Sequence, residues 1–135
     1  MKLTSGGETV SKAKDIMTTE VATIAASALV SEAIGLMRAK KIHSLIVKPR
    51  PSEKGYGILT EADIAYKVIA YGDDPKALTV ADIMTKPCIV VNPEMTVENV
   101  ARLFANNHIH RAPVIKDDLL GIISVTDILR KGKWW

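Results

Sequence analysis

The sequence contains one structural unit twice, and this repeat constrains the fold more than any other feature. The tetrapeptide Asp-Ile-Met-Thr at positions 15–18 recurs at positions 82–85, an offset of 67 residues. Without a gap, the same offset pairs His43 with His110; after the second copy shortens by three residues, positions 57–64 match positions 121–128. Polar and apolar matches that follow one another in a single register predict two copies of one supersecondary unit.

Each copy has roughly sixty residues, too few to bury its own apolar faces, so we expect the two copies to complete one another's core. The 135 residues are 47% hydrophobic but only 4% aromatic, so aliphatic side chains and methionine must build that core. A net charge of +3 does not by itself indicate a nucleic acid or a membrane as partner. The single cysteine, Cys88, excludes an internal disulfide, and no secretory signal is present. We therefore expect a cytoplasmic protein.

The predicted order of elements in each copy is strand, helix, strand, strand, helix. Short β-prone runs predict the strands, and apolar residues three and four positions apart predict the first helix. Thr96 can cap that helix in the second copy, whereas Leu29 at the matching position cannot. The strands are expected at 21–24, 44–47, 57–59, 88–91, 112–115 and 121–123, and the helices at 30–37, 63–71 (ended by Gly72), 97–104 and from about 127. The fold class is therefore α/β (α+β), with a tail at 1–10, a first domain at 11–72 and a second at 73–135.

A Gly-x-x-Thr/Ser-x-x-Asp segment occurs once in each copy, where a strand passes into a helix. Its residues are Gly57, Thr60 and Asp63 in the first copy and Gly121, Ser124 and Asp127 in the second. In one interpretation the hydroxyl and the acid form a capping box, and the glycine permits close packing. In the other, the hydroxyl donates to a phosphate at the helix start, the acid accepts both hydroxyls of a ribose, and the glycine leaves room for the ligand.

With both segments and both Asp-Ile-Met-Thr lead-ins, residues 11–131 resemble a tandem pair of cystathionine-β-synthase (CBS) domains, called a Bateman module. The resemblance implies a pair packed with pseudo-twofold symmetry, with clefts between the two domains that bind adenosine-containing ligands. It also implies that the acid contacts the ribose, that the hydroxyl contacts the phosphate, and that aliphatic strand residues hold the adenine. The nucleotide-binding residues carried over to this chain are Gly57, Thr60, Asp63, Gly121, Ser124, Thr126 and Asp127.

The second copy also contains His110-Arg111, which resembles the His-Arg pair that nucleotide-binding members of the family place near the phosphates. An arginine can bind a phosphate through two hydrogen bonds. The first copy has His43-Ser44 instead, so we expect the site at Asp127 to bind its ligand more tightly. The expected ligand is AMP, ADP or ATP, with S-adenosylmethionine ranked behind them, and no other cofactor is expected.

The resemblance implies a regulatory ligand-binding module and not an enzyme. Only eight residues follow Asp127, so we expect the module to act on an effector protein in trans or on its own assembly, as a homodimer formed through its helices. Two alternatives stay open: a constitutive interaction scaffold with empty clefts, and a module that binds nucleic acid. No membrane partner is expected.

The remaining candidate groups favour structural explanations. The histidines His43, His108 and His110 lack a metal-binding spacing, and the apolar run around Cys88 predicts a core residue rather than a nucleophile. A basic cluster lacks the aromatic side chains on which bases would stack, so it indicates a solvated surface. That cluster consists of Arg38, Lys40, Lys41, Lys48, Arg50 and Lys54. Two terminal aromatics, Trp134 and Trp135, are expected to pack on a neighbouring chain or groove.

Overall fold

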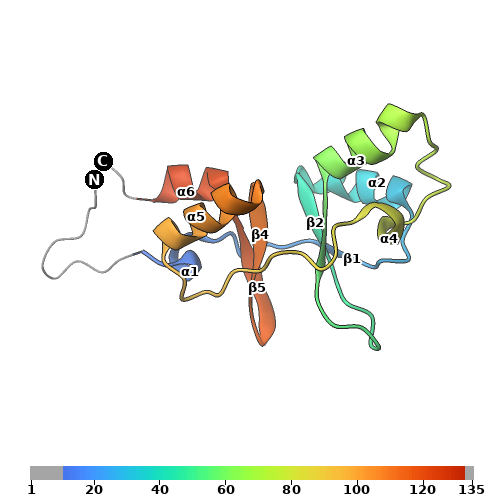
Figure 1. Ribbon diagram of the computed structural model, residues 1–135. Helices are drawn as coiled ribbons and strands as arrows, with labels where there is room; N and C mark the ends of the chain where they lie inside the picture. Colours follow the sequence, from blue (N-terminus) through green and yellow to red (C-terminus); the bar gives the residue numbers. More distant parts are fainter. Residues whose placement is uncertain (1–10, 133–135) are drawn as a thin grey trace, which may run out of the picture. The chain divides into compact units, whose positions relative to one another are not determined.

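The computed structural model describes residues 11–132, which form two compact units (Figure 1). Unit 2 is continuous and runs from Ala22 to Cys88, whereas unit 1 combines the described residues up to Val21 with those from Ile89 onward. The units therefore differ from the two sequence copies. The short helix that opens each copy packs with the body of the other copy: α1 (Ala13–Ile16) belongs to unit 1, and α4 (Val80–Ile83) belongs to unit 2.

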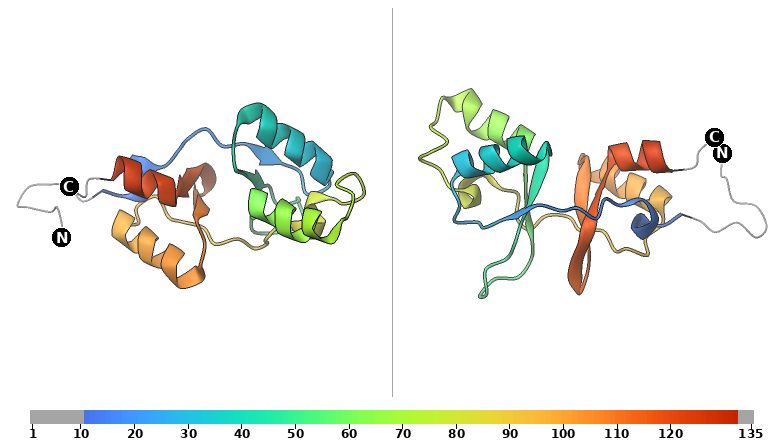
Figure 2. Two further views of the ribbon diagram at one scale, coloured as in Figure 1. Left: turned by 90° about the horizontal axis from the view of Figure 1, so that it is seen from above. Right: turned by 180° about the vertical axis from the view of Figure 1, so that it is seen from behind.

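Unit 2 is built on a three-stranded sheet in which β2 is central. The strand β1 pairs with β2 in parallel, and β3 pairs with β2 antiparallel. The helices α2 and α3 lie on one face of this sheet (Figure 2). The elements are β1 (Thr23–Ile24), α2 (Val30–Lys40), β2 (Ser44–Val47), β3 (Gly57–Thr60), α3 (Glu61–Lys67), the 3₁₀ helix η1 (Ile69–Tyr71) and α4 (Val80–Ile83).

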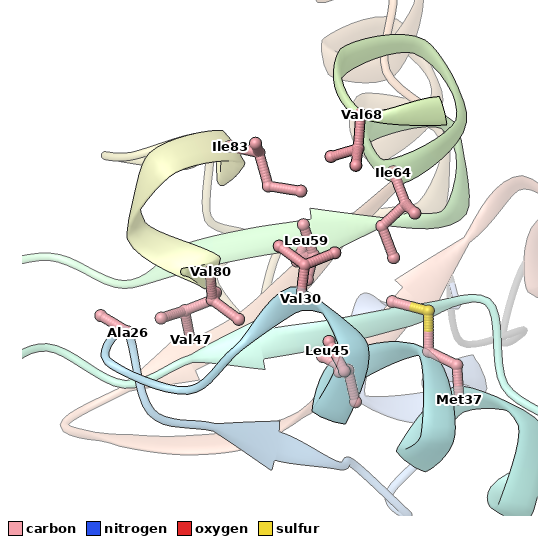
Figure 3. Packing of buried hydrophobic residues seen from close by; sticks show 11 residues of the cluster. Ala26, Val30, Met37, Leu45, Val47, Leu59, Ile64, Val68, Val80 and Ile83 are labelled. Carbon is pink, nitrogen blue, oxygen red and sulfur yellow. The ribbon is translucent and has the colours of Figure 1, made fainter. Parts of the chain in front are cut away.

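The core of unit 2 is aliphatic, as the composition predicts (Figure 3). Leu45 and Leu59, on neighbouring strands, are fully buried together with Val30 of α2. Burial of each such side chain contributes about 2 kcal/mol relative to exposure. Val80 and Ile83 of α4 are buried in the same cluster, so the lead-in of the second copy completes the core of unit 2.

Unit 1 repeats this plan with a longer hairpin. The strands β4 and β5 are antiparallel, and Asp117 makes the turn between them with a φ of 62°. The helices α5 and α6 lie side by side on one face of the hairpin (Figure 2). Ala13 and Ile16 of α1 are buried in the core of this unit. The elements are α1, α5 (Val97–Asn107), β4 (Arg111–Lys116), β5 (Asp118–Ser124) and α6 (Val125–Lys131).

The repeat extends to the local backbone. The helices α2 and α5 end at Lys41 and His108, positions 67 apart, and both residues adopt the left-handed conformation, with φ values of 55° and 53°. The next residue closes the turn in both units: the N–H of Ile42 donates to the Met37 carbonyl, and the N–H of Ile109 donates to the Phe104 carbonyl, each at 3.1 Å. The same terminating turn thus forms twice without glycine.

The structure confirms the α+β class and changes some of the predicted elements. The predicted strand at 88–91 is wrong: within residues 11–132, only Val91 pairs there, with Val114 of β4. The run is divided between the units, because the Cys88 N–H donates to the Tyr56 carbonyl in unit 2 and the Val91 N–H donates to the Pro113 carbonyl in unit 1.

The second predicted helix of the first copy begins two residues early, as α3, and breaks at Val68 before η1. Gly72, with a φ of 69°, ends it as predicted. The predicted tail at 1–10 and the two tryptophans Trp134 and Trp135 lie outside the described residues. No helix within residues 11–132 is long and apolar enough to cross a membrane.

Candidate functional site

In unit 1 the motif hydroxyl and acid form a capping box at the junction of β5 and α6. The Asp127 N–H donates to Ser124 Oγ at 3.2 Å. In return, Asp127 Oδ2 accepts from the Ser124 N–H at 3.0 Å and from the Ser124 hydroxyl at 3.1 Å. The capping interpretation of the segment is therefore confirmed for this pair.

The other oxygen of Asp127 has two partners that the sequence interpretation missed, one by a hydrogen bond and one by an ion pair. The Thr18 hydroxyl donates to Asp127 Oδ1 at 3.1 Å, and Lys131 Nζ lies 3.0 Å from the same atom. Lys131 Nζ also donates to Thr18 Oγ1 at 3.3 Å. A carboxylate offers about four acceptor positions, so the described donors fill all four at Asp127.

Unit 2 contains the same arrangement with one donor fewer. Asp63 Oδ2 accepts from the Thr60 N–H at 2.9 Å and from the Thr60 hydroxyl at 3.1 Å, and Lys67 Nζ lies 3.0 Å from Oδ1. Lys67 also donates to the Ile83 carbonyl at 2.9 Å, on the lead-in of the second copy. Among the described residues, no hydroxyl reaches Asp63 Oδ1, so Asp63 has one protein donor fewer than Asp127.

A signal for the two lysines was present in the sequence. Lys67 and Lys131 each follow the motif acid by four residues, the spacing that brings side chains together on one face of a helix. The sequence indicates Thr18 more weakly: it ends the repeated Asp-Ile-Met-Thr tetrapeptide, but its approach to Asp127 is visible only in the fold. Its counterpart Thr85 has the same backbone pairing, with Ile58 as Thr18 has with Ile122, but among the described residues its side chain makes no hydrogen bond to Asp63.

The motif glycines are required by the lead-ins. A Cβ added at Gly121 would lie 2.7 Å from the Thr18 carbonyl oxygen and 2.9 Å from Met17 Sδ. A Cβ added at Gly57 would lie 3.0 Å from Met84 Sδ and 3.2 Å from the Thr85 carbonyl oxygen. Each glycine thus permits a strand of one copy to approach the lead-in of the other closely, which is the packing interpretation of these positions.

The His-Arg pair of unit 1 lies beside the capping box. Arg111 is the cross-strand partner of Ser124, so the two side chains project from the same face of the hairpin. The carbonyl of His110 accepts from the Val125 N–H at 2.9 Å, and the His110 side chain is exposed. Thr126, the remaining predicted site residue of this unit, is exposed in the first turn of α6.

In unit 2 a buried serine occupies the position of the arginine. Ser44 is 8% exposed and is the cross-strand partner of Thr60. The neighbouring His43 pairs through Nδ1 with Glu61 Oε1 at 2.7 Å. This unit therefore offers no guanidinium next to its capping box.

Each unit also has an apolar groove between its two helices. Groove A, between α2 and α3, and groove B, between α5 and α6, each enclose about 450 Å³. Several large apolar side chains on α3, η1 and α6 are exposed: Tyr66, Ile69 and Tyr71 in unit 2, and Val125 and Leu129 in unit 1.

Cys88 and the histidines form no reactive or metal-binding cluster. Burial raises the pKa of the Cys88 thiol to about 11, so this half-buried group is a neutral thiol at physiological pH and a poor nucleophile. No group of three or more histidine, cysteine, aspartate or glutamate side chains in the described part of the chain is placed to hold a metal ion.

The basic cluster of the sequence is divided in the structure. Arg38, Lys40 and Lys41 lie at the end of α2, before β2 begins, whereas Lys48, Arg50 and Lys54 follow the end of β2. A four-residue strand spans about 13 Å, so the two groups belong to opposite ends of the sheet. Glu53 forms an ion pair with Arg50 of the second group and another with Lys86.

Comparison with known protein families finds the CBS domain twice in this chain, at residues 13–70 and 80–133. The chain is 33% identical over 119 residues to the CBS domain-containing protein YhcV of Bacillus subtilis, covering 87% of this chain and 83% of that protein. It is 36% identical over 105 residues to the mitochondrial CBS domain-containing protein CBSX3 of Arabidopsis thaliana, covering 75% of this chain but only 51% of that protein.

Two solved structures are informative neighbours. A hexameric CBS-CP12 protein from bloom-forming cyanobacteria is 57% identical, with a TM-score of 0.90 over 94% of this chain and 75% of that one. The CBS domain pair of protein MJ0100, in complex with 5′-methylthioadenosine and S-adenosyl-L-methionine, is 27% identical, with a TM-score of 0.79 over 91% of this chain and 96% of that one.

Proposed function

The chain belongs to the CBS domain family, and we propose that it is a regulatory module that binds an adenosine-containing ligand. The observation that carries this proposal is the duplicated polar group in which a hydroxyl, a carboxylate and a lysine meet at the start of a helix, once in each unit. The complex of the MJ0100 pair with two adenosine-containing molecules supports the same ligand class for this chain.

We assign the ribose to the carboxylates and the phosphates to the groups around them. Asp127 and Asp63 accept the ribose hydroxyls, and Arg111 binds phosphate in unit 1 because it projects beside Ser124. The other members of the two sites are Gly57, Thr60, Gly121, Ser124, Thr126 and His110. Arginine and lysine side chains next to the sites favour AMP, ADP or ATP over S-adenosylmethionine, whose sulfonium centre is cationic.

Regulation then follows from differential affinity. If the chain or its assembly has two conformations, the ligand raises the population of the conformation that binds it more tightly. We propose that the assembly is a homodimer or a multiple of one, formed through grooves A and B and the exposed apolar side chains around them. The hexameric state of the CBS-CP12 neighbour supports self-association. The regulated activity would reside on a partner protein or in this assembly, and the chain itself would not be an enzyme.

Isothermal titration calorimetry with AMP, ADP, ATP and S-adenosylmethionine tests the ligand. We expect Asp127→Ala to abolish the tighter binding event and Asp63→Ala to abolish the weaker one. The matched control is Asp118→Ala, which removes an exposed acid at the hairpin turn of unit 1 and should leave both events intact. Unchanged affinity in both site variants would refute the assignment. A mass spectrum of small molecules that co-purify with the protein identifies the ligand independently.

One observation favours a second candidate, a constitutive interaction scaffold. Three hydrogen bonds and the ion pair with Lys131 account for the Asp127 carboxylate without a ligand. In that case no adenosine ligand would raise the melting temperature, and the oligomeric state measured by sedimentation would not respond to nucleotides. Leu129→Glu in groove B and Tyr66→Glu on α3 would weaken self-association under either candidate, so the nucleotide response is the measurement that separates them.

A further inference from the structure

The carboxylate of Asp127 cannot accept a ribose diol without losing donors that it already has. Its Oδ2 is held by the backbone and side chain of Ser124, and its Oδ1 by Thr18 and Lys131. A carboxylate has about four acceptor positions, and two ribose hydroxyls need two of them. Binding at this site is therefore an exchange of hydrogen bonds rather than an addition.

Lys131 is the donor best able to leave. Its side chain is 47% exposed, whereas that of Asp127 is 10% exposed. The Ser124 N–H is fixed in the capping box, but the lysine has a flexible four-carbon stem whose ammonium group can move into water. A hydroxyl such as that of Thr18 can also rotate its proton toward a different acceptor.

We propose that Lys131 is a selectivity residue that favours phosphate-bearing adenosine ligands over neutral ones. The inference rests on the proposed ribose contact at Asp127. When a ribose displaces Lys131 from Asp127, the lysine ammonium group loses the carboxylate that lies 3.0 Å away. A phosphate on the same ligand supplies a new partner within reach of the freed side chain, whereas a neutral nucleoside supplies none. At a partly exposed site, a cation within about 7 Å of a phosphate changes affinity by about tenfold.

The counterpart in unit 2 has a smaller effect. Lys67 also donates to the Ile83 carbonyl at 2.9 Å, so it keeps a good partner after it leaves Asp63. The second contact of Lys131 is longer, at 3.3 Å from the Thr18 hydroxyl. Asp63 also has one protein donor fewer than Asp127, so a diol displaces fewer protein contacts there. Phosphate selectivity should therefore be stronger in unit 1 than in unit 2.

The test compares AMP with adenosine, because the two ligands differ only in the phosphate. Calorimetric titrations are made in the Asp63→Ala background, so that unit 1 alone responds. Lys131→Met should reduce the preference for AMP over adenosine by about tenfold: AMP binds more weakly, and adenosine binds as well as before or better because its competitor has gone. Lys131→Arg should retain the preference.

Lys116→Met is the matched control, since it removes one positive charge from an exposed lysine at the end of β4, away from the capping box. A preference unchanged within twofold in Lys131→Met would overturn the inference, and so would an equal loss in Lys116→Met, which would indicate bulk charge. Failure of the proposed function looks different: the Asp63→Ala protein with its native Lys131 would then bind neither AMP nor adenosine, and this inference would fall with it. Circular dichroism spectra confirm that each variant is folded.

Discussion

The two units share one backbone plan but differ in how firmly each holds the lead-in helix and the carboxylate at its site. In unit 1 the carboxylate of Asp127 reaches across to Thr18 of the lead-in, whereas in unit 2 the carboxylate of Asp63 has no such hydroxyl partner among the described residues. Unit 1 also presents Arg111 where unit 2 has a buried serine. The comparison shows that the duplicated backbone places the same polar group in both units, and that substituted side chains around it change its hydrogen bonds and charge.

A second difference lies at the start of each lead-in. In unit 1, Lys12 and Lys14 both donate to the carboxylate of Glu94 at 2.7 Å. The residue 67 positions before Glu94 is Ser27, so unit 2 has no carboxylate at the matching position. Ion pairs with Glu94 thus supplement the backbone pairing that holds the lead-in of unit 1. The lead-in of unit 2 depends on the backbone pairing between Leu29 and Thr79.

The largest expected difference concerns the motif glycines. Gly121→Ala should lower the free energy of unfolding by about 3 kcal/mol and Gly57→Ala by about 1 kcal/mol, because the new Cβ meets a backbone oxygen at 2.7 Å in unit 1 but a flexible methionine sulfur first in unit 2. Urea unfolding followed by circular dichroism measures both. Gly35→Ala, in a helix with open space around it, should instead stabilise the protein by about 1 kcal/mol. Equal losses at the two motif glycines would contradict the comparison.

Removal of the motif acids should give the next largest difference. Asp127→Ala leaves a cap N–H, a hydroxyl and an ammonium group without their acceptor, so we expect a loss of about 2 kcal/mol. Asp63→Ala should lose about 1 kcal/mol, typical of a helix cap. The same urea titrations measure both variants, and a larger loss at Asp63 would reverse the proposed order of the units.

The hydroxyl of Thr18 allows a sharper test of why the units differ. Thr18→Val removes one hydrogen bond to a nearly buried carboxylate at almost constant volume and should cost about 1 kcal/mol. Thr85→Val is the matched change in unit 2, where the exposed side chain has no hydrogen bond within the described residues, and it should be nearly neutral. If both variants have the stability of the wild type, the Thr18 hydroxyl does not account for a difference in stability between the units.

The smallest effect is the pH dependence that Glu94 gives to unit 1. Hydrogen bonds from Lys12 and then from Lys14 lower the pKa of Glu94 from 4.5 to about 2. A carboxylate with a lowered pKa in the folded state stabilises the protein above pH 4.5, and this contribution is lost as the pH falls toward 2. The stability difference between wild type and Glu94→Gln should therefore shrink over that range in acid-unfolding curves. The control Glu20→Gln, on an exposed residue of the same unit, should show no such convergence.

Much of the fold follows from the sequence because the repeat fixes the register. A match in one copy predicts the same element in the other. The strands predicted at 44–47 and 57–59 and the two helix caps were obtained in this way, and the second strand is one residue longer in the structure. The strand predicted at 88–91 did not form, because a β-prone segment can also serve as the connection from one unit to the other. Periodicity describes how a segment buries its side chains but does not say which partner it pairs with.

The site was predicted in its local part only. The pairing of Ser124 with Asp127 is set by three residues of spacing, and sequence alone can suggest it. The approach of Thr18 is not local, since 109 positions separate it from Asp127. It depends on the exchange of lead-ins between copies, which no single segment records. Lys131 lies between these cases: its four-residue spacing from Asp127 was visible in the sequence, but the proposal for it required the distance to the carboxylate.

The exchange of lead-ins also imposes an order on folding during synthesis. Unit 2 is continuous, so all its residues are available once Cys88 has left the ribosome. Residues 11–21 emerge earlier, yet Thr18 must wait for Ile122, its backbone partner in β5. The first described segment to be made is thus among the last to find its place, and unit 1 closes only after unit 2 can already have formed.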